Sequence, residues 1–532
     1  MTGKFTVPDY TKVRHRDHWV GLVITGIVFL VYLATLAPDL TFEHEGSDGG
    51  DLITAAYTLG VPHPPGYPTY TILAWLFTHL PFGTIAYRVN LLSAVCAALA
   101  IYFFFRITWE LQPEADRTLI IPIASTTILA FSSLYWSQAV IAEVYALLAL
   151  FSTLLLWLLI RWRNGAQDWY LWLGGLFFGI GLGNHLSLVF ILPASLILLW
   201  SERRRWFRLR VLLPAFLLFL VGISVFMYLP IAAAHDPPVN WGNPQTWDGF
   251  VWVVTARPYQ SFVFGLPSEN ISTRLGTWGL LFIEQFWWWG LIIAGIGIIA
   301  WFIRDRTFLF FSVVWGVPLA IFAFAFQPSD SFMFLIPVFI LLAICWGEGV
   351  RLLMLIGGQL TARTADTSPN PTISAFWRWW PRIIVLLLPI ALMTSNWNKI
   401  NLSKDVSAPT YISEILNALP EGSVVLTRCD KPTFSLWYEL YVNQNRTDLL
   451  VVNGRLLSYD WYRQQISSRY PELNLPIVYQ ETDSDDYISE FITLNLNNHS
   501  MFATDPSLEW ENRFNFTDLG ESPVYRISPK VE

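Results

Sequence analysis

The sequence carries little charge for its length. Only 14% of its 532 residues are Asp, Glu, Lys or Arg, and 54% are hydrophobic. Soluble domains carry roughly 25% charged residues. The apolar residues gather in long runs, which excludes an ordinary soluble protein and predicts that lipid surrounds most of the chain.

Other absences exclude whole classes of function. Of the three cysteines, Cys96 and Cys345 fall inside apolar runs and Cys429 stands alone, so neither a disulfide framework nor a zinc set is available. The sequence contains no Walker A motif and no Rossmann glycine fingerprint. A net charge of −7 gives no basic footprint for nucleic acid. We therefore expect no bound cofactor, and the residues give no support for a divalent metal. Synthesis outside the cell would draw its energy from an activated, lipid-linked donor.

Eleven apolar runs are long enough, or nearly so, to cross a bilayer. They lie at 19–37, 86–107, 118–134, 141–162, 170–187, 188–201, 210–231, 277–302, 307–325, 331–354 and 383–397. A further apolar stretch, 69–80, is short and is expected to be re-entrant or interfacial. The predicted fold is a polytopic α-helical membrane protein with about 11 spans.

Positive charge predicts the orientation. Lys and Arg gather in the leader and in alternate loops, whereas the segment from Ala37 to Tyr87 contains neither. This pattern predicts a cytoplasmic N-terminus and an outside first loop. No small-residue cleavage motif follows the leader, so a cleaved signal peptide is not expected. The absence of retention motifs and of paired cysteines favours a prokaryotic plasma membrane.

The tail has ordinary charge density and a different pattern. Short apolar runs, Ser423–Thr427 and Leu449–Asn453, alternate with amphipathic segments at Thr433–Tyr441 and Asp460–Arg469. This alternation predicts a small α/β domain. The predicted organisation is a cytoplasmic leader (1–18), a transmembrane module (19–397) whose first outside loop (38–85) is catalytic, and an extracytoplasmic α/β domain (398–532).

The first outside loop is the strongest candidate site. Glu43, Glu45, Asp48 and Asp51 lie within nine positions, with no cation nearby. Like charges this close raise at least one pKa, and such a carboxylate can act as a base near neutral pH. Asp48 would be the N-cap of a helix that begins near Asp51, with both carboxylates on one face. The alternative is a solvated acidic loop.

Further candidates lie on the same predicted side of the membrane. The run that contains His63 and Tyr67, His-Pro-Pro-Gly-Tyr-Pro, cannot be helix interior and predicts a rigid surface loop. Glu143, beside Tyr145, lies at the outer end of a span, where an ionisable residue is a functional candidate or a carboxylate that faces the interface. Asn184 and His185 end another span, where a structural role for the histidine is equally expected.

Three outside positions complete the candidates: Trp241, Arg257 and Asp330. An interfacial arginine such as Arg257 could hold the phosphate of a lipid-linked substrate, or it could anchor lipid headgroups. Asp330 is a further carboxylate near the membrane.

Four blocks of the sequence resemble a known family. The block from Glu45 reads Glu-Gly-Ser-Asp-Gly-Gly-Asp-Leu-Ile-Thr-Ala-Ala-Tyr-Thr-Leu-Gly-Val-Pro-His-Pro-Pro-Gly-Tyr-Pro. It is similar to the signature of the membrane family that includes transmembrane protein 260, related to protein O-mannosyltransferases and of the GT-C class. The blocks at 136–145, 181–185 and 237–244 match the family in the same order, so the resemblance covers roughly 18–260.

The resemblance implies a GT-C glycosyltransferase that moves a sugar, with inversion, from a polyprenyl-phosphate donor to an extracytoplasmic acceptor. That acceptor would be a protein hydroxyl, a glycan or a lipid. Membrane lipids are the other expected partner, and nucleic acid is not. An acidic residue of the first outside loop acts as base in such enzymes, and Asp48 matches it. Asp51 stands where the family pattern has Glu, which weakens a direct catalytic role for it. The expected substrate-binding residues are Glu45, Asp51, His63, Tyr67, Glu143, Tyr145, Asn184, His185, Trp241, Arg257 and Asp330.

Two other functions remain open from the residues alone. A transporter or flippase for lipid-linked sugars would also be polytopic, but it predicts charged residues near the middle of spans and repeat symmetry, and neither is evident. A non-catalytic membrane protein would use its C-terminal domain to bind a cell-envelope partner.

Overall fold

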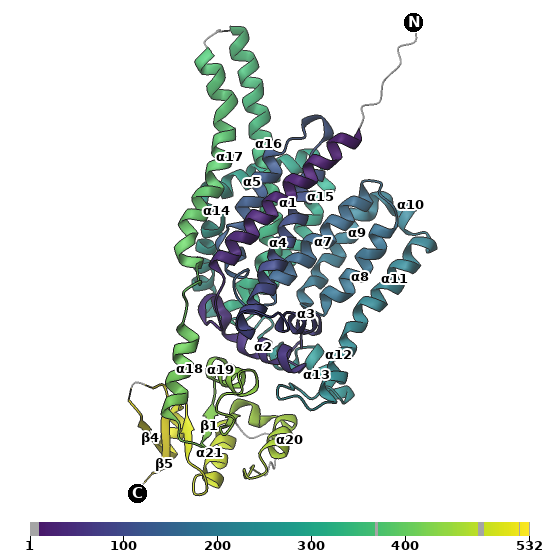
Figure 1. Cartoon of the computed structure of the whole chain (residues 1–532). Coiled ribbons are helices and arrows are strands. Elements are labelled where there is room, and N and C mark those ends of the chain that lie inside the picture. The colour runs from purple at the N-terminus through teal and green to yellow at the C-terminus, as the bar shows by residue number, and fades with distance from the viewer. Residues whose placement is uncertain (1–9, 368–370, 477–483, 521, 531–532) are drawn as a thin grey trace.

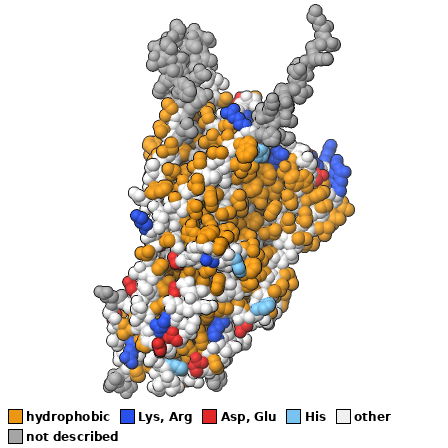
Figure 2. All heavy atoms as spheres, viewed as in Figure 1, with side chains coloured by type: hydrophobic (Ala, Val, Ile, Leu, Met, Phe, Trp, Pro, Cys, Tyr) orange, Lys and Arg blue, Asp and Glu red, His pale blue; other side chains and the backbone are white. Residues whose placement is uncertain are grey.

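A computed structural model describes residues 10–367, 371–476, 484–520 and 522–530. A bundle of long helices stands on a small α/β domain, and short helices lie between them (Figure 1). Hydrophobic side chains cover the visible flank of the bundle, whereas charged side chains gather toward its ends and on the α/β domain (Figure 2). This distribution is that of an integral membrane protein.

Within the residues that the structure describes, eight apolar segments have the length and composition to cross a membrane. They include all or most of α1 (Tyr10–Thr35), α4 (Ile85–Glu110), α7 (Tyr145–Arg163), α9 (Ile191–Leu199), α11 (Leu209–Ile223), α14 (Ile271–Arg304), α15 (Arg306–Ala325) and α16 (Ile336–Thr367). The other three predicted spans coincide with α5 (Ile120–Ala130), α8 (Trp169–Leu182) and α17 (Pro371–Ile400). The helices at the predicted spans 118–134 and 170–187 are shorter than the predicted runs. They have 11 and 14 residues, fewer than the ~20 that a straight crossing needs.

The bundle is held closely packed by glycines. A Cβ atom added to Gly175 of α8 would lie 2.2 Å from the carbonyl oxygen of Ala215, and one added to Gly222 of α11 would lie 2.2 Å from that of Leu176. Both distances are impossible contacts, so α8 and α11 pack backbone against backbone. Small residues serve this purpose in membranes because apolar burial alone does not hold two helices together in lipid.

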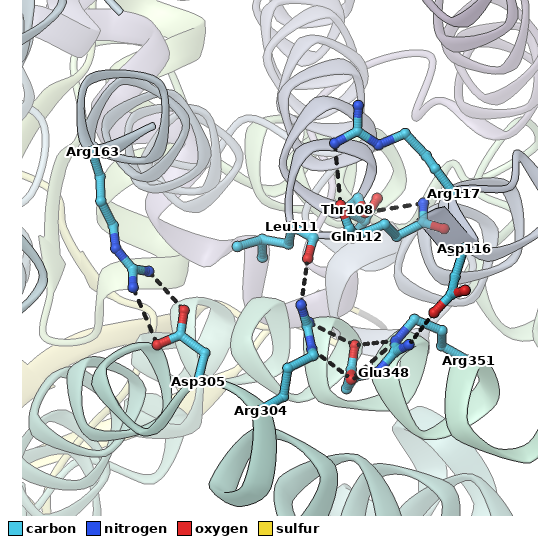
Figure 3. A network of polar contacts seen from close by, with 10 residues as sticks. All are labelled: Thr108, Leu111, Gln112, Asp116, Arg117, Arg163, Arg304, Asp305, Glu348 and Arg351. Atoms are coloured by element: carbon cyan, nitrogen blue, oxygen red, sulfur yellow. Dashed lines mark hydrogen bonds and ion pairs between the residues drawn. The ribbon is translucent and has the colours of Figure 1, made fainter. Parts of the chain in front are cut away.

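A charged network joins four helices where α14 ends (Figure 3). Glu348 of α16 accepts hydrogen bonds from Arg304 (2.9 and 2.8 Å) and from Arg351 (2.7 Å). Arg304 also donates to the carbonyl of Leu111 at 2.9 Å, which fixes the end of α4. Beside it, Arg163 of α7 pairs with Asp305 at 2.9 Å. Glu348 is buried, and a buried carboxylate is costly to ionise without a partner. Its two arginine partners therefore stabilise its charged form.

The α/β domain contains a five-stranded sheet in the order β2-β1-β3-β5-β4. Its strands are β1 (Val424–Thr427), β2 (Leu450–Asn453), β3 (Met501–Ala503), β4 (Phe514–Asp518) and β5 (Tyr525–Pro529). β1 pairs in parallel with β2 and β3, whereas β5 is antiparallel to β3 and β4. Its helices are α18 (Ser407–Ala418), α19 (Asp430–Tyr441), α20 (Asp460–Arg469), α21 (Ser484–Asn495) and α22 (Leu508–Arg513). The strands predicted at Ser423 and Leu449 and the two amphipathic helices are confirmed.

Between the bundle and this domain lie α2 (Gly49–Thr58) and α3 (Pro68–Thr78) (Figure 1). The stretch 69–80 is thus one short helix, as expected for an interfacial segment. Pro68 occupies its first position, where a missing N–H has no hydrogen-bonding cost. The loop between the two helices carries the His-Pro-Pro-Gly-Tyr run, and it is mostly buried rather than exposed.

Candidate active site

The acidic loop forms a tight turn that presents Asp48 without using it as a cap. A short 3-10 helix spans Glu43–Asp48, and α2 begins at Gly49. His44 and Glu45 have φ values of 59° and 63°, in the left-handed region that non-glycine residues seldom adopt. Asp48 occupies the N-cap position, as expected, but its side chain accepts no capping hydrogen bond. Its carboxylate is therefore available for other contacts.

His63 lies between Asp48 and Asp51. Its Nδ1 atom is 2.7 Å from Oδ2 of Asp51, and its Nε2 atom is 3.6 Å from Oδ2 of Asp48. One turn of α2 separates the two carboxylates, so they share a face, and the imidazole from the following loop joins them. The ring also packs against the rings of Tyr67 at 5.1 Å and Phe434 at 6.4 Å. The histidine is thereby fixed in position.

The hydrogen bonds of Asp51 hold His63 in position. It is completely buried, and Oδ2 accepts a second hydrogen bond from the backbone N–H of His63 at 2.9 Å. Its other oxygen accepts one from Nε1 of Trp241 at 3.1 Å. Trp241 reaches it because the backbone N–H of Val61 donates to Val239 and that of Trp241 donates back to Val61. Asp51 holds His63, and Asp48 faces the remaining nitrogen.

The charged side chains of this group shift one another's pKa values. Surrounding protein desolvates Asp48, although 37% of its side chain stays exposed, and this raises its pKa to about 7; protonated His63 opposes the shift. Burial lowers the pKa of His63, but Asp48 and Asp51 outweigh it and raise the pKa to about 9. At neutral pH the histidine is an imidazolium between two carboxylates, one of which titrates near neutrality.

The charges of three more predicted carboxylates are coupled to this group. Glu143 is buried, and burial followed by the charge of Asp48 raises its pKa well above the usual value. Burial also raises the pKa of Glu45, with a contribution from Asp330. Asp330 in turn adds to the shift of Asp48. The sequence places these residues far apart, and the structure brings them to one site.

Tyr145, Asn184 and His185 lie beside the segment that carries Glu143. The side-chain amide of Asn184 donates to the carbonyl of Val144 at 3.1 Å. The ring of His185 lies 5.6 Å from that of Tyr145, and its Nδ1 atom contacts the Ser187 hydroxyl at 2.7 Å. His185 is therefore engaged within its own turn.

Arg257 stays apart from the carboxylates. Its side chain is 60% exposed and lies 3.5 Å from Asp248. The same short helix, Arg257–Phe262, instead brings Tyr259 to the site. Burial raises the pKa of that phenol well above its usual value, and Asp48 and Asp430 add to the shift. Tyr259 was not predicted from the sequence.

The α/β domain completes the site with residues that the sequence interpretation missed. Asp430 begins α19, directly after β1, and burial raises its pKa while His63 opposes the shift. Phe434 of the same helix stacks on His63 with 13° between the ring planes. One signal was present: ligands of α/β sheets bind beyond the carboxyl ends of parallel strands, which is where Asp430 lies.

The domain is docked tightly against the acidic loop. A Cβ atom on Gly50 would lie 2.6 Å from the carbonyl oxygen of Phe434, so only glycine permits this approach. Lys431 places its ammonium group 4.2 Å from the ring centre of Phe42 and 4.4 Å from that of Tyr411. Thr41 donates to Asp405 at 2.5 Å, and Tyr438 donates to Asp39 at 3.3 Å. The site is thus shared by both parts of the chain.

Within the described ranges, no group of three or more His, Cys, Asp or Glu side chains is arranged to hold a metal ion.

Two family profiles match the chain in order. The profile of the protein O-mannosyl-transferase TMEM260 N-terminal domain matches residues 48–207, and that of TMEM260-associated domain 2 matches residues 408–528. The first begins at Asp48, and the second covers the α/β domain.

Two relatives are similar in sequence to most of this chain. Protein O-mannosyl-transferase TMEM260 of Mus musculus is 26% identical over 465 residues, which cover 84% of this chain and 65% of the mouse protein. The Dictyostelium discoideum protein O-mannosyl-transferase tmem260 is 25% identical and is covered to 66%, with 94% of this chain aligned. The chain spans about two thirds of the length of these relatives.

The fold is that of a solved membrane protein. ArnT from Cupriavidus metallidurans, bound to undecaprenyl phosphate, superposes with a TM-score of 0.57 at 12% identity, over 96% of this chain and 98% of ArnT. Its apo form gives the same TM-score at 11% identity. The GT-C fold expected from the sequence is therefore confirmed.

Proposed function

We propose that this chain, which belongs to the GT-C membrane family that includes TMEM260, transfers a sugar from a polyprenyl-phosphate donor to an acceptor hydroxyl outside the cytoplasm. The relatives are named protein O-mannosyl-transferases, which supports the reaction class. The undecaprenyl phosphate of the ArnT structure supports the lipid carrier. The observation that carries the proposal is the Asp51–His63–Asp48 group at the end of an apolar bundle.

In this proposal Asp48 is the general base. The acceptor oxygen attacks the anomeric carbon as its proton moves to Asp48, and the bond from that carbon to the phosphate oxygen breaks with inversion. The polyprenyl phosphate leaves with the electron pair. Asp48 suits the step because its pKa of about 7 leaves it largely ionised at slightly alkaline pH yet basic enough to accept a proton. Asp51 acts through His63 as a positioning residue.

The acidic surroundings favour the same chemistry. Glycosyl transfer passes through a transition state in which positive charge develops on the sugar ring. Carboxylates placed around that ring stabilise the developing charge more than they stabilise the neutral donor, which lowers the barrier. Glu45, Asp330 and Asp430 are proposed for this role. Glu143, whose strongly raised pKa favours the neutral acid, is proposed to orient sugar hydroxyls.

The leaving phosphate needs a cation. Arg257 is proposed to hold it, because its guanidinium is exposed and its contact with Asp248 is long at 3.5 Å. Arg274 is less available, since it already donates to the carbonyl oxygens of Phe326, Gln327 and Pro328. The proposed orientation places the site and the α/β domain outside and the basic leader in the cytoplasm, as the positive-inside rule predicts.

The test is transfer by purified protein in nanodiscs. Undecaprenyl- and dolichyl-phosphate sugars are supplied as donors, with mass spectrometry of an extract of candidate acceptors. Asp48→Asn should lower transfer by roughly 10²-fold or more at unchanged melting temperature. Asp518→Asn, an exposed aspartate of β4, is the matched control and should retain activity. Full activity in Asp48→Asn would refute the assignment of the base.

A further inference from the structure

The connection between α9 and α11 carries a dense group of arginines at the end of the bundle away from the α/β domain (Figure 1). The short helix α10 (Arg203–Trp206) and the turn before α11 form this connection. Lys and Arg side chains gather there at the margin of the apolar flank (Figure 2). Residues 202–210 hold one carboxylate and five arginines, namely Arg203, Arg204, Arg205, Arg208 and Arg210.

One of these arginines fixes the connection, and the others lie on its surface. Arg205 is 2.7 Å from Asp168 and donates to the carbonyl of Trp162 at 3.3 Å, which ties α10 to the segment between α7 and α8. The remaining four are exposed and are called the basic patch: Arg203, Arg204, Arg208 and Arg210. The guanidinium groups of the last three have no hydrogen-bond or ion-pair partner in the part of the chain that the structure describes.

Other arginines of the bundle have their charge used inside the protein. They pair with carboxylates of other helices or of the turns between them, as in Arg106–Asp17, Arg163–Asp305 and Arg304–Glu348. Such pairs hold helices together. The basic patch joins no helices in this way, so its positive charge is open to an anion from outside the chain.

Exposed apolar side chains alternate with the basic patch. Trp200 is 57% exposed, Phe207 59% and Leu209 73%. The exposed apolar surface continues along α11 through Leu213, Phe216, Leu217 and Leu220. Because α9 and α11 belong to two apolar segments of spanning length, the basic patch lies where these segments leave the membrane. At this depth basic and aromatic side chains meet lipid headgroups, and apolar side chains meet acyl chains.

This combination selects one class of ligand. The phosphodiester of a phospholipid carries the negative charge that guanidinium groups bind, and its acyl chains would cover the exposed face of α11. A nucleic acid or an acidic protein would match the arginines but would leave Phe207 and Leu209 without an apolar partner. We propose that the basic patch binds the headgroup of an anionic phospholipid in the leaflet at this end of the bundle. The proposal is independent of the proposed function.

Native mass spectrometry of the full chain in detergent measures this binding. The probes are phosphatidylglycerol, phosphatidylcholine and inorganic phosphate. Phosphatidylglycerol should bind roughly tenfold or more tightly than phosphatidylcholine, because only its headgroup has a net negative charge. Inorganic phosphate should not displace it, because phosphate has no acyl chains to cover α11.

Variants of the basic patch test which residues bind the lipid. The triple variant Arg204→Gln, Arg208→Gln and Arg210→Gln should weaken phosphatidylglycerol binding by about thirtyfold or more, since each arginine near a membrane surface contributes roughly fivefold. The corresponding triple Lys variant keeps the charge and should stay within about threefold of wild type. Arg526→Gln, which removes an exposed arginine of β5 in the α/β domain, is the matched control and should leave binding unchanged.

Melting curves in nanodiscs separate lost binding from misfolding. A ligand that binds only the folded chain stabilises it, so wild type should melt at a higher temperature in phosphatidylglycerol than in phosphatidylcholine. The triple Gln variant should melt like wild type in phosphatidylcholine and gain less from phosphatidylglycerol. Equal binding of the two lipids by wild type, displacement by inorganic phosphate, or unchanged binding in the triple Gln variant would overturn the proposal.

Discussion

Nδ1 of His63 lies 2.7 Å from Asp51, and its opposite nitrogen faces Asp48 at 3.6 Å. This relationship gives the two aspartates different roles, although they are three positions apart in one acidic loop. Asp51 is fully engaged and buried, whereas Asp48 keeps a partly exposed carboxylate with only the longer contact to His63.

Replacement of Asp51 should act through His63. In Asp51→Asn the imidazolium loses a charged partner, so the pKa of His63 should fall and transfer should drop by roughly 10²-fold. The KM for the lipid donor should change little. A pH–rate profile distinguishes this from misfolding, because its alkaline limb should move to lower pH. An unshifted limb with reduced activity would contradict the positioning role.

The wild-type pH dependence follows from the same pair. Asp48 must be ionised to accept a proton, so transfer should rise as pH increases through about 7. Loss of the His63 proton removes the charge that pairs with Asp48 and holds its carboxylate in place, so transfer should fall as pH increases through the His63 pKa of about 9. The raised pKa of His63 also contributes to stability below its ordinary value of about 6.5, and that contribution is lost as pH rises through about 9. Transfer assays and melting curves from pH 5.5 to 10 test both statements.

Gly50 should tolerate no side chain. Gly50→Ala would push the backbone of α19 away and separate Phe434 from His63. We expect at least a tenfold loss of transfer and faster proteolysis between the bundle and the α/β domain. Gly276→Ala is the matched control, since nothing lies within 4 Å of its added Cβ in α14, and it should be neutral or slightly stabilising. Equal behaviour of the two variants would refute tight docking.

Asp430 tests the contribution of the α/β domain to chemistry. Asp430→Asn removes one carboxylate near His63 and should lower transfer roughly tenfold while the melting temperature stays unchanged. The exposed Asp518→Asn again serves as control. Wild-type kinetics in Asp430→Asn would restrict the domain to a structural role.

The network in Figure 3 should matter for stability alone. Glu348→Ala leaves Arg304 and Arg351 without their shared partner in a buried setting, which costs roughly 3–5 kcal/mol. Asp486→Ala breaks the exposed pair with Arg513 and should cost at most about 1 kcal/mol. Thermal unfolding in nanodiscs measures both. The network is about 28 Å from Tyr145, the 19-residue length of α7, so folded Glu348→Ala should keep its KM for the donor.

The sequence by itself determined the membrane bundle, because apolar runs of span length have no stable alternative to lipid-embedded helices. It also determined the strands and helices of the tail through their periodicity, and it located the acidic loop through its carboxylates. Those features depend on residues that are neighbours in the chain.

Only the tertiary structure decided which residues share the site. Asp51 and Asp48 look alike in sequence, and the different partners of their oxygens come from His63 and from Trp241, 190 positions away. Asp430 and Phe434 reach the site because α19 docks on Gly50, a contact between residues almost 400 positions apart. Local patterns record propensity and periodicity, but the pKa of a carboxylate depends on burial and on charges that folding brings near it.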